Sequence, residues 1–417
     1  MKLDYRKTFV LGLGFFAISI SWSVYNSYVP VFLKQFTNSA ALIGFIMTLD
    51  NIAAILVQPY FGSLSDRTWN RFGRRMPFLL IGVPLSAVLF AVIPLHTSLA
   101  ALVLIVFFFN AAMTIYRAPT VALMPDLTPS PLRSKANGII NFMGGIGTLL
   151  AFFVASILYD RGRAVPFVFT SMLMLAAAGV LFLGIKERRG ESGEAAGERT
   201  GILRAVLDLV RSEDKSALAM LGAIFFWFLG YAAIEAFFTL YGKLFLGIKE
   251  SAAAFSLGFL SVAFLLMALP SGFLATRWGR RRTIVLGIIC MLIALAALHF
   301  SHGLALRVPA LSELWLVRGI LIVAGLAWAL ININSYPMVV DMTVEARIGT
   351  YTGLYYLFSS LAAVGGPLLL GGLIDLVNWL AGSRTAGYGG IFAFGFIAFA
   401  LALLCMTAVR RGEAQGG

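Results

Sequence analysis

Four ionisable side chains lie inside long apolar stretches of this 417-residue sequence, namely Asp50, Arg117, Glu235 and Arg318. An ionised group at the centre of a bilayer is costly on every insertion scale, so such residues are functional candidates by default. A carboxylate at that depth is stable when protonated or paired, which makes Asp50 and Glu235 candidate proton carriers and Arg117 a candidate partner of Asp50. A static Asp50–Arg117 pair would equally neutralise both charges. Arg318 lies near enough to one end of its stretch to reach water.

A second set of polar and aromatic side chains occupies the middle of the same stretches. Amides bind hydroxyl groups and aromatic rings cover the flat face of a cyclic ligand, since unpaired hydroxyls in a dry site cost affinity. Taken singly, each aromatic residue is better explained by helix packing, whereas the asparagines are harder to hide. The candidate substrate-binding residues are Trp22, Tyr25, Asn26, Asn110, Tyr231, Trp328, Asn332, Asn334, Tyr336 and Tyr355.

A basic motif occurs twice, each time between two apolar stretches. The first copy runs from Gly62 to Arg67 and continues at Gly73-Arg74-Arg75; the second runs from Gly272 to Arg281, and its leading glycine is displaced by 272 − 62 = 210 residues. Asp126, Gly138 and Asp160 recur as Asp341, Gly353 and Asp375, each 215 residues later. The chain is therefore a duplicated unit, and parallel duplication in a membrane protein is typical of a two-domain transporter.

The charged side chains of this motif predict an inner-face cluster that holds the halves in one state. Thr276 replaces the acid of the second copy, so we expect an asymmetric cluster. The alternative is that these arginines only set topology. The candidate gating residues are Gly62, Asp66, Arg67, Gly73, Arg74, Arg75, Asp126, Arg133, Asp341 and Arg347.

Composition indicates which elements must position these residues. Apolar residues make up 60% of the chain and charged residues 12%, too much hydrocarbon for a water-soluble domain. Stretches of roughly 20 apolar residues predict twelve transmembrane helices, six in each half. We expect an all-α membrane protein of two pseudo-symmetric six-helix bundles, residues 1–185 and 216–417, joined by a linker at 186–215.

The net charge of +13 reflects topology rather than a nucleic-acid partner. Most lysines and arginines fall in the loops that share a side with the N-terminus, as the positive-inside rule describes. We therefore expect a multi-pass protein of the cell (plasma or inner) membrane with both termini in the cytoplasm, in contact with lipid and functional as a monomer.

Twelve spans, the duplicated unit and the basic motif together resemble the major facilitator superfamily over essentially the whole chain. Three further features are similar to its glycoside permeases, in particular the sucrose-transporter-like branch. These are the long loop from Ser65 to Phe78, the preceding Gln58-Pro59, and the fourth-span ending from Ala118-Pro119 to Asp126-Leu127.

The resemblance implies secondary active import of a disaccharide or related glycoside with a proton, by alternating access. It also implies that the first, fourth, seventh and tenth helices border a central cavity. Two positions depart from the pattern: Asn110 stands where plant-like members carry a buried aspartate, and Gln58 where sodium-coupled melibiose-type permeases carry an acid. The coupling ion and its site therefore do not follow from the resemblance, and sodium is disfavoured.

Two other classes of function remain. A proton-driven exporter of drugs or small metabolites would share the fold, but exporters commonly carry a Gly-Pro-rich fifth span, and the fifth span here contains no proline. A membrane-embedded enzyme lacks suitable residues, because His96, His299 and His302 fall at span ends. We expect no enzyme activity, no cofactor and no metal site.

Overall fold

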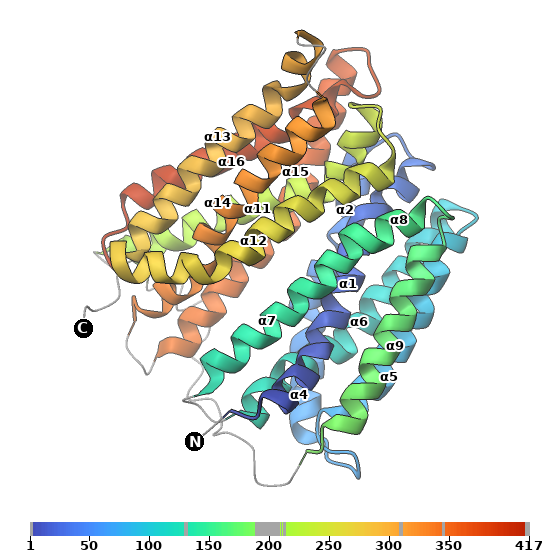
Figure 1. Ribbon diagram of the computed structural model, residues 1–417, viewed down its shortest axis with the longest axis vertical. Coiled ribbons are helices and arrows are strands. Elements are labelled where there is room, and N and C mark those ends of the chain that lie inside the picture. The colour runs from blue at the N-terminus through green and yellow to red at the C-terminus, as the bar shows by residue number, and fades with distance from the viewer. Residues whose placement is uncertain are drawn as a thin grey trace. The chain divides into compact units, whose positions relative to one another are not determined.

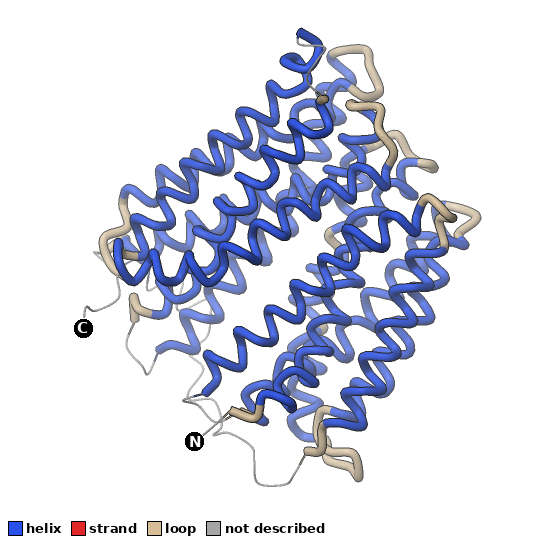
Figure 2. The backbone as a smooth tube through the Cα atoms, viewed as in Figure 1, coloured by secondary structure: helices blue, strands red, loops and turns tan. Residues whose placement is uncertain are grey.

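The computed structural model describes residues 3–128, 132–187, 209, 211, 214–307, 312–343 and 347–412. Within these residues twelve spans are long and apolar enough to cross a bilayer, and no β-strand is found. Long helices joined by short loops make up the described chain (Figures 1 and 2). A helix satisfies every backbone group within its own segment, which a bilayer demands. The predicted all-α, twelve-span fold is confirmed.

Several spans are interrupted, so the structure has more helices than spans. The first six spans consist of α1 (Tyr5–Lys34), α2 (Ala40–Met47) with α3 (Leu49–Leu56) and α4 (Gln58–Arg67), α5 (Met76–Val92), α6 (Leu99–Leu127), α7 (Arg133–Leu149) with α8 (Ser156–Tyr159), and α9 (Val165–Gly184). The last six are α11 (Ser216–Leu244), α12 (Glu250–Trp278), α13 (Arg280–Arg307), α14 (Glu313–Val340), α15 (Ile348–Leu380) and α16 (Ile391–Thr407).

The second span is broken at Thr48 and at Val57. Pro59 lies in the first turn of α4, where its missing backbone N–H removes a hydrogen bond to the preceding turn, so α3 ends just before it. The break at Thr48 places Asp50 in the first turn of α3.

The fifth span contains a π-helical turn at Leu150–Ala155, between α7 and α8. Such turns insert an extra residue into a helix and are frequent at functional sites. No glycine or proline lies within this turn, so the sequence carries no signal for it.

Contacts between residues divide the chain into two compact units. Unit 1 comprises Met1–Asn38, Ile46–Glu194 and Glu250–Gly258, and unit 2 comprises Ser39–Phe45, Ala195–Lys249 and Phe259–Gly417. Unit 1 holds most of the first six spans and unit 2 most of the last six; the first residues of α2 group with unit 2 and the first residues of α12 with unit 1.

The two units repeat the same pattern of helix packing. In unit 1, α1 packs on α7 and α9, and α5 packs on α6 and α9. In unit 2, α11 packs on α15 and α16, and α13 packs on α14 and α16. When the six spans of the first half are matched in order with the six of the second half, each packed pair in unit 1 has its counterpart in unit 2. The packing therefore agrees with the duplication seen in the sequence.

Glycine allows the closest of these contacts. A Cβ atom at Gly147 would lie 2.6 Å from the carbonyl oxygen of Phe16, and one at Gly366 would lie 2.4 Å from that of Leu229. Neither distance is sterically possible without a shift of the backbone. Small residues therefore bring α7 against α1 and α15 against α11, as is common in membrane bundles.

Candidate functional site: a polar–aromatic cluster and a basic-loop cluster

Two of the predicted substrate-binding positions of α1 meet α6 in unit 1. The ring of Tyr25 stacks on Phe109, with centroids 5.7 Å apart, and Trp22 lies edge-on to Tyr25 at 5.4 Å and to Phe109 at 6.1 Å. Asn110 follows Phe109 on α6 and is 2% exposed, while Tyr25 is fully buried. We refer to Trp22, Tyr25, Phe109 and Asn110 as the polar–aromatic cluster.

Four buried polar atoms without a hydrogen bond lie together in this cluster, whereas Ser86, Tyr159, Thr170, Trp227, Thr239 and Tyr388 each have one such atom. The indole Nε1 of Trp22, the hydroxyl of Tyr25 and both amide atoms of Asn110 form no hydrogen bond of good geometry with the described residues, although the Tyr25 hydroxyl and the Asn110 amide lie close to each other. Leaving a buried donor or acceptor unsatisfied costs about 1–3 kcal/mol per group. Such groups are retained where a ligand or water completes them, so the cluster has the chemistry of a binding site for a hydroxyl-rich molecule.

Arg117 borders the polar–aromatic cluster. Its guanidinium carbon lies 5.8 Å from the centre of the Trp22 ring, within the range of a cation–π contact. The helix that carries Asp50, α3, packs on α6, which carries Arg117. The amide of Asn51 donates a 2.9 Å hydrogen bond to Oδ1 of Asp50. The predicted coupling residues of the first half therefore belong to neighbouring helices.

The predicted residues of the second half form an aromatic group in unit 2. Tyr231 stacks face to face on Trp328, with centroids 4.3 Å apart and planes 6° apart. Glu235 follows Tyr231 by one helical turn on α11 and is partly buried. Tyr355 shares a 3.3 Å hydrogen bond with Ser335, and the 37%-exposed Tyr336 contacts the Tyr355 ring edge-on at 5.4 Å.

Three other predicted positions have different surroundings. Asn334 is buried and its amide nitrogen donates to Oγ of Ser271 and to the carbonyl of Leu330, both at 2.9 Å, which favours a packing role. Asn26 and Asn332 are partly buried on α1 and α14. Arg318 lies over the rings of Trp315, at 4.8 Å, and Phe259, at 5.4 Å.

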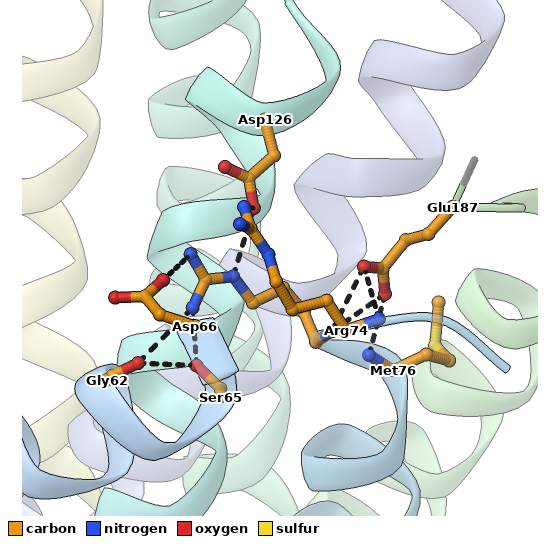
Figure 3. Close-up of polar contacts among 8 residues, drawn as sticks. Gly62, Ser65, Asp66, Arg74, Met76, Asp126 and Glu187 are labelled. Atoms are coloured by element: carbon orange, nitrogen blue, oxygen red, sulfur yellow. Dashed lines mark hydrogen bonds and ion pairs between the residues drawn. The ribbon is translucent and has the colours of Figure 1, made fainter. Parts of the chain in front are cut away.

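The first basic motif forms a compact charge cluster centred on Arg75. Figure 3 shows Gly62, Ser65, Asp66, Arg74 and Asp126 of this cluster. The Arg75 guanidinium donates to Oδ2 of Asp126 at 3.0 Å, to the carbonyl of Gly62 at 3.3 Å and to Ser65, and it pairs with Asp66. Arg74 pairs with the same Asp126 oxygen at 2.7 Å. We call Gly62, Ser65, Asp66, Gly73, Arg74, Arg75, Asp126 and Glu187 the basic-loop cluster.

Glu187 completes this cluster, and sequence analysis did not identify it. Its carboxylate accepts hydrogen bonds from the backbone N–H groups of Arg74, Arg75 and Met76 at 2.8–3.0 Å (Figure 3). These amides open α5, and the first N–H groups of a helix form an anion site. Gly73 precedes them with a φ of +115°, a conformation suited to glycine. The sequence offered only a weak signal, an acid just beyond the sixth span.

Replacing Glu187 by alanine is expected to lower the free energy of unfolding by about 1.5–3 kcal/mol, the range for hydrogen bonds to a charged group. Glu187→Gln keeps one acceptor oxygen, so its free energy of unfolding should lie between those of the parent protein and Glu187→Ala. Thermal unfolding of the purified protein measures the loss of stability. Tryptic cleavage at Arg71 and Arg74 reports opening of the loop. Unchanged melting and unchanged cleavage in Glu187→Ala would refute this role.

The second basic motif is simpler. Arg280 pairs with Asp341, as Arg74 pairs with Asp126 in the first copy, and it also donates to the carbonyl of Pro337 at 3.1 Å. Arg281 instead donates to the carbonyl of Met406. The hydroxyl of Thr276 donates to Phe273, so the partner that Asp66 provides in the first copy is missing.

Two further candidate gating residues, Arg67 and Arg347, are exposed. Arg67 ends α4 and is exposed, with no ion pair among the described residues. Arg347 precedes α15 and is exposed. The side chain of Arg133 lies outside the described residues, although its backbone begins α7.

Twelve spans in two packed repeats, with polar groups held inside apolar helices, define a multi-pass membrane transporter. The sequence profile of the Major Facilitator Superfamily matches residues 11–367 and, overlapping these, 246–416. The chain belongs to this superfamily. It is therefore a transporter of small molecules and, as the sequence predicted, not an enzyme.

Similar proteins of known name include sugar transporters and a drug transporter. The chain is 25% identical over 157 residues to the sucrose transport protein SUC3 of Arabidopsis thaliana, a match that spans 32% of this chain and 26% of that protein. It is 23% identical to the isoprimeverose transporter of Lactiplantibacillus pentosus, over 74% of this chain and 67% of the relative. It is 24% identical to multidrug resistance protein 2 of Bacillus subtilis, over 84% of each chain.

Solved structures share the fold. The nucleoside transporter NupG superposes with a TM-score of 0.74 at 17% identity, over 98% of this chain and 100% of that one. A bacterial homologue of the human lysosomal transporter Spinster superposes with a TM-score of 0.74 at 16% identity over 100% of both chains. At such identities the likeness establishes the architecture and leaves the substrate to be argued from the site.

Proposed function

We propose that this protein imports a disaccharide or related glycoside together with a proton by alternating access. The observation that carries this proposal is the polar–aromatic cluster, where Tyr25, Trp22 and Asn110 hold unpartnered polar atoms beside aromatic faces. A sugar has hydroxyls to satisfy these atoms and apolar ring faces to stack on the aromatic rings. The similarity to a sucrose transport protein and to an isoprimeverose transporter supports the same substrate class.

Asp50 is the proposed proton carrier. It opens α3, which packs on the helix of Arg117, so a protonated and an ionised Asp50 would interact differently with that guanidinium. A substrate bound near Trp22 would also meet Arg117, which lies beside the Trp22 ring. The two residues therefore provide a route by which protonation and sugar binding influence each other. Glu235 is the alternative carrier.

We also propose an orientation and a location for the protein in the membrane. Most lysines and arginines fall in the loops on the side of the N-terminus, and by the positive-inside rule that face lies in the cytoplasm of a cell membrane, with both termini on the same side. On this assignment the basic-loop cluster is a cytoplasmic gate. We propose that one chain forms the complete transport unit.

A second candidate is a proton-driven exporter of hydrophobic cations. The match to multidrug resistance protein 2 covers more of the chain than the sugar-transporter matches do. The stacked Tyr231–Trp328 pair, with Glu235 one turn away, also has the aromatic and acidic character that binds organic cations. The unpartnered amide of Asn110 favours the sugar, because a hydrophobic cation would leave it unsatisfied.

Uptake into proteoliposomes distinguishes the two functions. With an acid exterior, we expect at least one compound from a panel of glucosides, galactosides and related disaccharides to accumulate, while hydrophobic cations do not. Asp50→Asn mimics the protonated form, so it should lose gradient-driven accumulation but retain sugar counterflow, whereas Glu235→Gln should retain both. Movement of hydrophobic cations without any sugar would establish the exporter. If Asp50→Asn still accumulates sugar, Glu235 and not Asp50 is the proton carrier.

A further inference from the structure

A crevice of about 300 Å³ lies in unit 2 between the first turns of α13 and the last turns of α16. It has two arginines at one end and apolar side chains along the rest. Its main lining residues are Arg281, Arg282, Leu286, Ile289, Leu403 and Met406.

The crevice lies where two spans leave the apolar region. Arg281 and Arg282 belong to the first turn of α13, directly before its apolar stretch, and Met406 is in the last turn of α16. Leu286 is 38% exposed and Ile289 42% exposed, so the apolar part opens onto the outer surface of the bundle. A charged end at the interface and an apolar groove running into the hydrocarbon match the shape of a membrane lipid.

The charged end suits a phosphate group. Nε and Nη2 of Arg281 both donate to the carbonyl oxygen of Met406 at 3.3 Å, which fixes this guanidinium at the rim of the crevice. Arg282 is exposed and forms no ion pair with the described residues. Guanidinium groups bind phosphate oxygens through parallel N–H bonds.

The lipid must carry a net negative charge. Among the described residues, none that lines the crevice is acidic. Two acids that follow or precede the spans of unit 2 are engaged by other arginines, since Asp341 pairs with Arg280 and Asp214 pairs with Arg411 at 2.6 Å. A zwitterionic headgroup would therefore bring its own cation towards two arginines, and the described lining offers that cation no carboxylate. An anionic headgroup meets only favourable charge.

We propose that this crevice binds one anionic phospholipid, with its phosphate on Arg281 and Arg282 and an acyl chain along Leu286, Ile289 and Leu403. The lipid bridges α13 and α16 and strengthens their packing at the basic face. This inference does not depend on which substrate the protein transports.

Lipid binding to the purified, delipidated full chain tests the proposal. We expect dioleoyl phosphatidylglycerol to bind as one tightly held molecule in native mass spectra and to raise the melting temperature, whereas dioleoyl phosphatidylcholine does neither. Inorganic phosphate at the same concentration should have no effect, because the acyl chain supplies much of the binding. An equal shift with phosphate alone would establish a free-anion site, and equal binding of both lipids would establish a non-selective groove; either result overturns the proposal.

Three variants locate the site. Arg282→Gln should weaken phosphatidylglycerol binding about tenfold or more, since hydrogen bonds to a charged group are worth about one such factor. Ile289→Trp should obstruct the apolar groove without removing charge and also weaken binding. Arg277→Gln removes the same charge from an exposed position at the end of α12, outside the crevice, and should leave binding unchanged. Equal losses in Arg277→Gln and Arg282→Gln would reduce the effect to general attraction and refute the site.

Discussion

Replacing Arg75 with alanine is expected to lower the free energy of unfolding by about 3 kcal/mol or more and to slow transport strongly. The Arg75 side chain is 5% exposed and contacts Asp126, Asp66, Ser65 and Gly62. Removing one partner of a buried ion pair costs about 3–5 kcal/mol because the other charge stays behind. The cost should lie at the lower end of that range, since the Asp66 side chain is 54% exposed and can be hydrated.

Arg75→Lys should recover only part of the stability, because an ammonium group cannot reproduce the forked geometry that reaches these acceptors from one position. Thermal unfolding and initial transport rates measure the two effects. Substrate affinity should change by no more than a few fold, since the basic-loop cluster lies outside the polar–aromatic cluster.

Arg71→Ala is the matched control. Arg71 belongs to the same loop and carries the same charge, but it is exposed and its guanidinium lies 4.5 Å above the Phe72 ring. An exposed cation–π contact is worth about 0.5–1 kcal/mol, so this variant should be nearly as stable as the parent. If Arg71→Ala is as damaging as Arg75→Ala, loop charge alone and not the buried contacts of Arg75 explains the loss.

Replacing Asn110 with leucine is expected to make the protein more stable and to abolish substrate binding. Neither amide atom of Asn110 forms a hydrogen bond of good geometry with the described residues, although the Tyr25 hydroxyl lies close by, and each buried group left unsatisfied costs about 1–3 kcal/mol. A leucine of similar shape removes that cost together with the groups proposed to bind the substrate. Melting temperature and equilibrium binding of the transported sugar measure the two effects, which should move in opposite directions.

Asn334→Leu provides the opposite case. Asn334 is equally buried, but its amide nitrogen donates to Ser271 and Leu330. Asn334→Leu removes satisfied hydrogen bonds, and Oγ of Ser271 loses the donor that Asn334 provides. The protein should therefore melt at a lower temperature. A rise in stability for both variants would show that packing volume, rather than hydrogen bonding, controls these positions. Retained binding in Asn110→Leu would remove Asn110 from the site.

The spans and the duplication could be predicted because both are patterns of residue type and spacing along the sequence. Apolar stretches mark the helices, and the displacement of 215 residues between Asp126 and Asp341 relates the Arg74 and Arg280 ion pairs before any contact is known. Pro59 likewise explains why α3 ends where it does.

The partners of individual side chains could not be predicted in the same way. In a soluble helix an apolar stripe marks the buried face, but a span is apolar both towards lipid and towards its neighbours, so the rotation of each helix is hidden. Asn110 and Asn334 therefore looked alike in the sequence, although one is unpartnered and the other is held by Ser271. The π-helical turn at Leu150–Ala155 has no composition signal at all.

The hydrogen bonds of Glu187 have a consequence for the order in which the protein is assembled during synthesis. Glu187 follows Arg74 by 113 residues, so the anion site at the start of α5 stays incomplete until the sixth span has been made. At about 5–20 residues per second this delay is roughly 6 to 23 s. Asp126 is translated well before Glu187, so the ion pair of Arg74 can form during this interval. In the nascent chain the ion pair of this loop can thus form first. The hydrogen bonds from its backbone to Glu187 form last, when the first half leaves the insertion machinery.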